Sequence, residues 1–163
     1  MASAEPDDGL ATRLRPAVPD ELAALLRLTS QLGAFPVPAW RTPAEIGAAD
    51  HHLLIQALHS PTPDVSLLVA EAAGGEPLGC ILTTTREDYF THRPVAHIEV
   101  LVVDPRAQGQ GLGPRLIAAA EQWAVGRGID QITLNVFARN QRARALYDRL
   151  GYQPETIHYW KKL

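Results

Sequence analysis

The sequence predicts an α/β protein in which helices cover a mixed β-sheet. Short runs rich in β-branched residues alternate with longer runs whose apolar residues recur at helical spacing. In chain order these runs are a strand, two helices, three strands, a helix, a strand, a helix and a strand, and such an order is typical of helices packed on the faces of a sheet. With 163 residues, 46% of them hydrophobic, the chain can bury one substantial core. We therefore expect a single domain over residues 10–163, preceded by a flexible tail at residues 1–9.

The first strand and the first helix are assigned to residues 11–15 and to a stretch opened by the acids Asp20 and Glu21. The apolar stripe of that helix consists of Leu22, Leu25, Leu26 and Leu28. Prolines crowd the segment Gly33–Pro43, which is expected to interrupt regular structure and either pack or line a site. The second helix is therefore placed only at about His51–His59.

The rest of the chain divides at glycines and prolines. Gly74 and Gly75 mark a hairpin turn between two strands. The predicted strands are residues 65–72, 77–85, 95–103, 131–137 and 156–162, and the predicted helices are residues 113–125 and 140–150.

Composition excludes several classes of protein. A net charge of −3 and a pI near 6.0 provide no basic field, so we expect no nucleic-acid partner. No apolar run approaches the roughly 20 residues of a membrane span, and the N-terminus lacks a basic and apolar leader. The only cysteine, Cys80, indicates a reducing compartment, with the cytoplasm as the default. His51, His52 and His59 lack partners at zinc-ligand spacing, so no metal is expected.

A glycine-rich turn, Gln108–Gly113, separates a strand ending at Asp104 from a helix beginning near Pro114. Such a turn presents free backbone N–H groups at the positive end of a helix, where a phosphate or pyrophosphate binds. The same glycines are also compatible with a plain strand-to-helix turn. A Walker A loop is disfavoured because no Gly-Lys-Ser/Thr ends the turn, and a Rossmann fingerprint is disfavoured because the spacing is GxGxG.

Two motifs give the chain a family resemblance. Gln108-x-x-Gly111-x-Gly113 after the strand His97–Asp104 resembles the coenzyme A motif of the GNAT superfamily of N-acetyltransferases. The later segment, which runs from Asn140 through Tyr147 to Tyr152, resembles the segment that closes the thioester site in that superfamily. The resemblance implies the GNAT acyl-CoA N-acyltransferase fold, with about six to seven strands and about four helices, and acetyl-CoA as co-substrate without a metal.

The resemblance also implies how coenzyme A would bind. The pantetheine arm would pair with the backbone of Leu101, Val102 and Val103 at a splayed strand edge. The pyrophosphate would be held by the N–H groups of Gln108, Gly109, Gln110, Gly111, Leu112 and Gly113. Asn140 would reach the pantetheine arm or the adjacent phosphate region, although asparagine at this position is equally suited to a plain helix N-cap.

Glu99 is the candidate general base, acting directly or through water. Alternation along a strand places it on one face with His97, Leu101 and Val103, where apolar burial would raise the pKa of its carboxyl group. Its position matches a glutamate that serves as base in many members of the superfamily. The alternatives are that Glu99 is a salt-bridged or solvated acid, or that His97 or solvent is the base.

Tyr147 is the candidate general acid. A phenol titrates near ~10, above a typical thiol at ~8.5, so it can protonate the departing sulfur. Its position in the motif matches a tyrosine with this role in similar enzymes, and the alternative is simple core packing. The backbone N–H near Val102 would polarise the thioester carbonyl.

The acceptor of the acetyl group is expected to be a primary amine of a small molecule or peptide. The resemblance places its wall at Phe35–Arg41 and Glu87–Phe90, where Glu87 and Asp88 would attract a cationic amine. The competing function is a non-catalytic module that binds and senses acetyl-CoA. Homodimerisation through a sheet edge is common in the superfamily, but no feature of this sequence specifies it.

Overall fold

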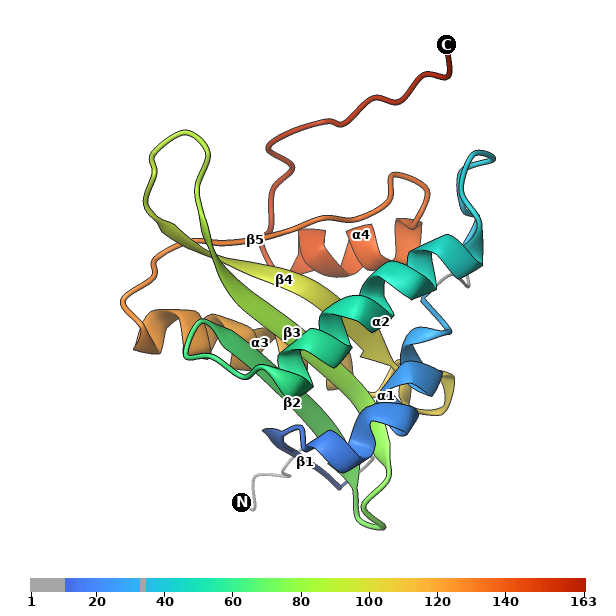
Figure 1. Ribbon diagram of the computed structural model, residues 1–163, viewed down its shortest axis with the longest axis vertical. Coiled ribbons are helices and arrows are strands. Elements are labelled where there is room, and N and C mark those ends of the chain that lie inside the picture. Colours follow the sequence, from blue (N-terminus) through green and yellow to red (C-terminus); the bar gives the residue numbers. More distant parts are fainter. Residues whose placement is uncertain (1–10, 33–34) are drawn as a thin grey trace, which may run out of the picture.

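A five-stranded mixed sheet forms the centre of the molecule (Figure 1). The computed structural model describes residues 11–32 and 35–163. The strands are β1 (Thr12–Pro16), β2 (Val65–Ala72), β3 (Pro77–Glu87), β4 (Pro94–Val103) and β5 (Ile132–Leu134), and they lie in the order β1-β2-β3-β4-β5. The first four strands are antiparallel, and β5 pairs with β4 in parallel. The expected α/β fold is confirmed, but the described residues hold five strands instead of the predicted six to seven.

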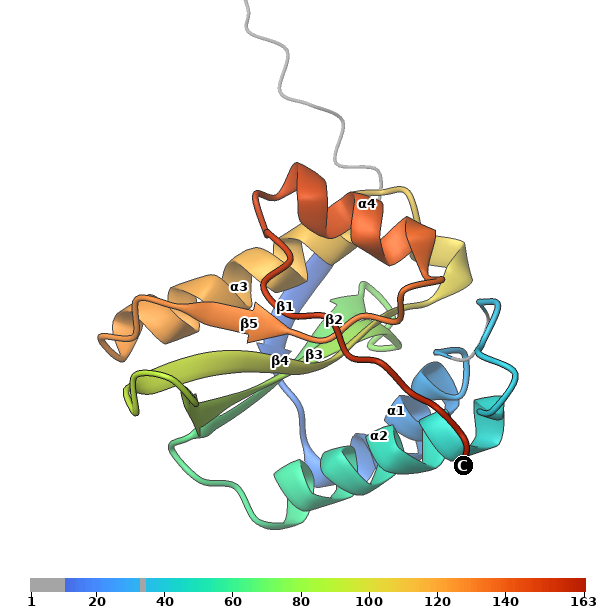
Figure 2. The same cartoon turned by 90° about the horizontal axis from the view of Figure 1, so that it is seen from above.

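Helices cover both faces of this sheet (Figure 2). The helices α1 (Leu22–Thr29) and α2 (Pro43–His59) lie on one face, and α3 (Leu112–Gly126) and α4 (Gln141–Arg149) lie on the other. Single 3-10 turns at Pro19–Glu21 and Pro105–Ala107 precede α1 and α3. The four predicted helices are therefore present within the described residues.

Helix α2 begins at Pro43, well before the predicted start at about His51. Thr42 caps the helix: its Oγ1 accepts from the Glu45 N–H at 3.2 Å, and the Glu45 carboxylate accepts from the Thr42 N–H at 2.8 Å. Pro43 occupies the first helical position, where a missing N–H costs nothing because no helical acceptor exists for it. The proline that was interpreted as a helix breaker instead starts the helix.

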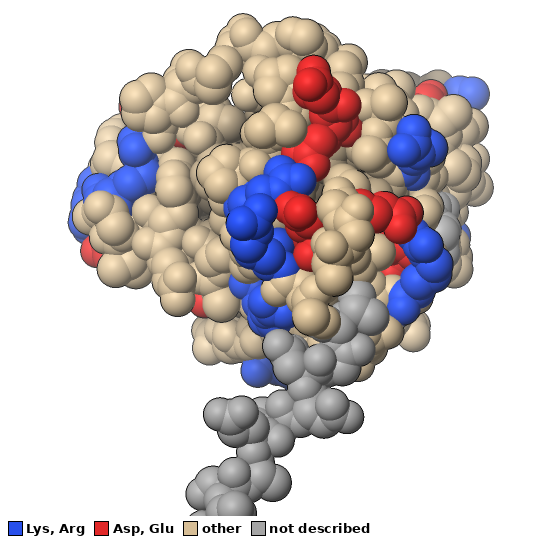
Figure 3. Space-filling model, turned by 90° about the horizontal axis from the view of Figure 1, so that it is seen from below, with Lys and Arg blue, Asp and Glu red and all other residues tan. Residues whose placement is uncertain are grey.

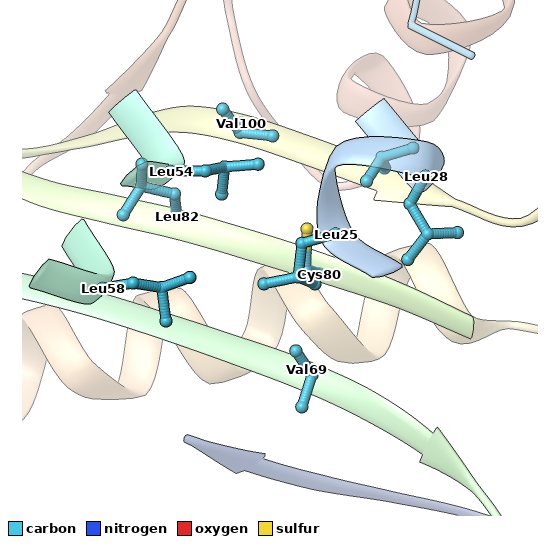
Figure 4. Close-up of a cluster of buried hydrophobic side chains, with 9 residues drawn as sticks. Leu25, Leu28, Leu54, Leu58, Val69, Cys80, Leu82 and Val100 are labelled. Atoms are coloured by element: carbon cyan, nitrogen blue, oxygen red, sulfur yellow. The ribbon is translucent and has the colours of Figure 1, made fainter. Parts of the chain in front are cut away.

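The main apolar core lies between the sheet and the α1–α2 layer (Figure 4). Leu25 and Leu54 are completely buried there against Cys80 and Leu82 of β3 and Val100 of β4. A second apolar cluster, which includes Ile81, Ile98 and Leu116, fills the space between the sheet and α3. The two clusters hold α2 and α3 at fixed positions on opposite faces of β4, and those positions determine what borders the candidate site.

The predicted last strand at residues 156–162 is wrong. Residues 152–163 contain no strand, and Ile157 and Tyr159 are largely exposed. The described sheet ends at β5, and none of its strands pairs with this segment. Instead, Trp160 stacks on Trp40, with ring centroids 4.6 Å apart and planes inclined by 4°.

Charges of both signs are mixed over the surface. On the face seen in Figure 3, acidic and basic side chains stand side by side without a continuous basic surface. Arg15 of β1, for example, contacts both Glu21 and Glu71. Within residues 11–32 and 35–163, no helix is long and apolar enough to cross a bilayer, and no three His, Cys, Asp or Glu side chains are grouped to hold a metal ion. The predicted tail at residues 1–9 lies outside the described residues.

Candidate active site

Strands β4 and β5 separate half-way along β4. Strand β5 pairs with β4 only from Ala96 to Ile98, opposite Ile132 to Leu134. Beyond Ile98 the edge of β4 has no partner from β5, and this unpaired stretch contains Leu101, Val102 and Val103. A strand edge of this kind can accept an extended ligand through backbone hydrogen bonds. That a pantetheine arm lies along these three residues stays a prediction.

A β-bulge at Glu99 changes the predicted distribution of side chains on β4. Leu82 of β3 lies opposite Val100, whereas Thr83 lies opposite Ile98, so Glu99 has no partner in the register. A bulge adds one residue to a strand and reverses the alternation beyond it. The prediction that Glu99 shares a face with Leu101 and Val103 is therefore wrong. Leu101 and Val103 pack in the cluster beneath α3, whereas Val100 packs in the cluster beneath α2.

The glycine turn is open at the start of α3. Gly109 and Gly111 have φ values of +78° and +76°, in the left-handed region that glycine adopts without strain. Among the described residues, no acceptor is found for the backbone N–H groups of Gly109, Gln110 and Gly111. The N–H of Gln108 donates only weakly to Pro105, at 3.4 Å. The turn thus presents adjacent backbone donors at a helix N-terminus, as an anion site requires.

The side chain of Gln108 ties this turn to its surroundings. Its Nε2 donates to the Val103 carbonyl at 3.0 Å, and its Oε1 accepts from Arg142 in the first turn of α4. The backbone carbonyl of Val103 is therefore already engaged. The sequence did not single out Arg142, although its position two residues after Asn140 was visible. Arg142 therefore places a positive charge beside the backbone N–H groups of the turn that have no acceptor. The charge of Arg106, in contrast, is paired with Asp104 and Glu76.

Asn140 caps helix α4. Its side-chain oxygen accepts from the Ala143 N–H at 3.1 Å, which is the ordinary N-cap arrangement. The alternative interpretation from the sequence is thus correct for this oxygen. No described residue accepts a hydrogen bond from the amide NH2 group of Asn140.

The carboxylate of Glu99 is fixed by neighbours on β3. Thr84 Oγ1 donates to it at 2.6 Å, and Arg86 contacts both carboxylate oxygens, with Nε at 2.9 Å and Nη2 at 2.6 Å. The Glu99 side chain is only 7% exposed. The expected apolar surroundings are therefore wrong, since a hydroxyl group and a guanidinium group hold this acid in place.

His97 lies near Glu99, but its side chain contacts Thr133 of β5. Its Nδ1 lies 2.7 Å from Thr133 Oγ1, and the residue is 7% exposed. Burial, with the Arg86 charge as the second cause, lowers the pKa of His97. The imidazole is consequently neutral at pH 7.

Tyr147 lies on the other side of β4. It packs with Leu101 and Val103 against the cluster beneath α3, and its ring centroid is 5.8 Å from that of Tyr152. Burial raises the pKa of Tyr147, which keeps the phenol protonated at neutral pH. Glu99 and Tyr147 thus border the unpaired part of β4 from opposite faces of the sheet. A thioester lying in the gap would have a carboxylate on one side and a phenol on the other.

Comparison with known proteins gives this arrangement a family. Residues 33–152 match the acetyltransferase (GNAT) family. The chain belongs to the GNAT family. Mycothiol acetyltransferase of Beutenbergia cavernae is 48% identical to this GNAT chain over 61 residues, which are 37% of the chain and 20% of that protein. Thialysine N-epsilon-acetyltransferase of Bos taurus is 35% identical over 101 residues, which are 58% of the chain and 59% of that protein. The chain therefore spans only part of the length of these curated relatives.

Solved structures confirm the GNAT fold. A putative acetyl transferase from Pyrococcus furiosus superposes with a TM-score of 0.75 at 24% identity, covering 93% of this chain and 99% of the other. The aminoglycoside N-acetyltransferase AAC(6')-Iy, in complex with the bisubstrate analog CoA-S-monomethyl-acetylneamine, gives a TM-score of 0.67 at 22% identity, covering 93% and 98% of the two chains.

The predicted acceptor wall of this GNAT chain is not one surface. The β3–β4 loop with Glu87–Phe90 extends from the end of the sheet opposite to the α1–α2 connection with Phe35–Arg41 (Figures 1 and 2). Glu87 pairs with His92 at 2.7 Å, and Asp88 accepts from Thr91 within its own loop. Aromatic contacts join the α1–α2 connection to C-terminal segments instead, with Phe35 on Phe137 and Trp40 on Trp160.

Proposed function

We propose that this chain is an N-acetyltransferase that moves the acetyl group of acetyl-CoA directly to a primary amine of a small molecule or peptide. The observation that carries the proposal is the conjunction of the unpaired β4 edge with the open glycine turn at the start of α3. The edge offers backbone hydrogen bonds to an extended arm, and the turn offers donors to an anion. Coenzyme A joins an extended pantetheine arm to a pyrophosphate, so it fits both features at once.

Two side chains would serve the chemistry. Attack by the amine requires loss of a proton, for which Glu99 is the proposed base, directly or through water. Collapse of the tetrahedral intermediate releases a thiolate, which Tyr147 would protonate. The N–H near Val102 would stabilise the oxyanion. The placement of the carboxylate and the phenol on opposite sides of the gap favours these roles, because the amine approaches the acetyl carbon and the sulfur leaves it in different directions.

The acceptor class rests on the relatives, because the Glu99 carboxylate is paired with the Arg86 guanidinium and the charges of this pair cancel. The relatives with the names mycothiol acetyltransferase and thialysine N-epsilon-acetyltransferase support a small amine as acceptor. Arg142 would add a cation for the phosphates of coenzyme A.

Calorimetry with coenzyme A, followed by thiol release from acetyl-CoA, tests the proposal. The acceptor panel would contain polyamines, amino acids with thialysine, aminoglycosides and short peptides. We expect coenzyme A to bind and at least one amine to accelerate thiol release. If coenzyme A does not bind, the proposal is wrong. Binding without thiol release for any amine would support the second candidate, a sensing module, for which the fixed state of Glu99 is the favouring observation.

Glu99→Gln tests the assignment of the base. We expect the pH profile of kcat/KM to lose the limb on which the base ionises, while coenzyme A binding stays unchanged. A superimposable profile would assign the proton to His97 or to solvent. Glu76→Gln, an exposed acid paired with Arg106, is the matched control for loss of one negative charge.

A further inference from the structure

Helix α2 crosses the sheet obliquely, with its C-terminal end over β2 and β3 and its N-terminal half toward β4 (Figure 1). In Figure 4, Leu58 lies over β2 and β3, and Leu54 lies between Leu82 of β3 and Val100 of β4. One turn further toward the start of the helix comes Asp50, since residues four apart share a helix face. Gly47, another turn on, is again buried. Asp50 therefore belongs to the stripe of α2 that faces the sheet, at the β4 end of that stripe.

The surroundings of Asp50 differ from those of every other acid near the site. It is half-buried, and none of the described residues donates a hydrogen bond to its carboxylate. The pKa of Asp50 is raised to about 6: burial is the largest cause, the His51 charge opposes it, and the Glu99 charge adds a smaller rise. His51 lies against the Leu26 carbonyl at 3.1 Å. From β3, Cys80 also faces Asp50, but burial raises the pKa of this thiol to about 12, so it is neutral.

Glu99 by itself is poorly arranged to retain a proton. Both of its oxygens accept hydrogen bonds from Arg86, and Thr84 occupies one of them again. Protonation would break the charge-assisted pair between the buried Glu99 carboxylate and the half-exposed Arg86 guanidinium, and such pairs are stronger than hydrogen bonds between neutral groups. A proton taken up by Glu99 needs another acceptor nearby, and Asp50 carries the neighbouring negative charge.

We propose that Asp50 is the final proton acceptor of the site, receiving through Glu99 the proton that the attacking amine loses. The inference rests on the proposed function and deepens it. An N–H bond of the acceptor ammonium breaks, the proton passes to Glu99, and an O–H bond forms on Asp50. The electron pair left on nitrogen forms the C–N bond to the acetyl carbon, and the C–S bond breaks with its electron pair on sulfur. The thiolate takes a proton from Tyr147, and the second proton that the nitrogen loses restores the phenol. After turnover Asp50 returns the proton to solvent through its exposed part, and Glu99 is restored to its pair with Arg86.

Asp50 acts through Glu99 and is therefore a positioning residue, so its test requires a pH profile. With acetyl-CoA and an active amine at saturation, we expect kcat of the wild type to rise with pH through an inflection near pH 6, the value given by the burial of Asp50. Asp50→Asn, which keeps the shape of the side chain, is expected to lower kcat about 10-fold to 100-fold and to remove the inflection. Asp50→Glu is expected to keep an inflection.

Controls separate this inference from the proposed function. Asp64→Asn removes an exposed acid paired with Arg127 and is expected to leave kcat and its pH profile unchanged. Coenzyme A binding measured by calorimetry must be the same for Asp50→Asn and the wild type, which shows that the variant is folded. If the wild type releases thiol and Asp50→Asn retains both rate and inflection, only the role of Asp50 is overturned. If the wild type releases no thiol with any amine, the proposed function fails first.

Discussion

Replacement of Gly111 by alanine tests the glycine turn most directly. Gly111 has φ +76°, and a Cβ at this position would meet no heavy atom within 4 Å. The methyl group therefore causes no clash, and the whole cost of the change is backbone strain. An L-residue in the left-handed region costs about 1–2 kcal/mol relative to glycine. That strain sets the size of the expected effect.

The strain must appear in one of two measurements. If the turn keeps its shape, the free energy of unfolding falls by about 1–2 kcal/mol, which lowers Tm by about 2–8 °C for a chain of this size. If the turn relaxes, the N–H groups rotate away, and coenzyme A must restore the strained shape when it binds. Its Kd then rises about 5-fold to 30-fold, because each tenfold change corresponds to about 1.4 kcal/mol. The sum of the two losses is expected to be about 1–2 kcal/mol.

Gly113→Ala is the matched control within the same turn. Gly113 does not have a positive φ, and its Cβ would lie 3.5 Å from Leu146 Cδ2, an ordinary contact. Because alanine has a higher helix propensity than glycine, the variant is expected to leave the free energy of unfolding unchanged or to raise it slightly. Urea denaturation and calorimetry with coenzyme A would be run on both variants. The reasoning from φ would be refuted if Gly113→Ala lost as much free energy of unfolding and of coenzyme A binding, taken together, as Gly111→Ala.

Three further changes probe other parts of the site. Tyr147→Phe is expected to lower kcat about 100-fold and to change the Kd of coenzyme A little, since only the proton donor is lost; an unchanged kcat would remove Tyr147 from the mechanism. The folded state raises the pKa of Asp50 from 3.8 to about 6, so its ionisation destabilises the fold as pH rises through that window. The shift corresponds to at most ~3 kcal/mol, or about 1–1.5 kcal/mol after allowance for its exposure. In urea denaturation, the free energy of unfolding of Asp50→Asn should equal that of the wild type at pH 4 and exceed it by that amount at pH 7. A difference in the free energy of unfolding that does not depend on pH would contradict this. Trp160→Ala should cost about 1 kcal/mol and abolish the exciton circular dichroism of the stack with Trp40, whereas a retained couplet would show that the stack is absent in solution.

Local sequence patterns correctly predicted the elements whose structure is set by residues close together in the chain. The strand at residues 65–72 was predicted with its observed bounds, because its apolar run is bounded by turn residues on both sides. The position of the glycine turn was predicted, and the positive φ values at Gly109 and Gly111 are ones that glycine permits. Errors arose where one residue type has two uses. Pro43 starts α2 instead of preventing it, and residues 156–162 alternate like a strand without a neighbouring strand to pair with.

The sequence by itself determined the fold class, the position of the glycine turn and the choice of Glu99 and Tyr147 as candidates. Each of these depends on residues close together in the chain. Only the tertiary structure decided what surrounds them: the bulge that separates Glu99 from Leu101, the Arg86 pair that fixes its carboxylate, and the approach of Asp50 from α2. These depend on how α2 crosses the sheet and on the register of β3 against β4. Such contacts between segments far apart in sequence arise from packing, which no local pattern of residues encodes.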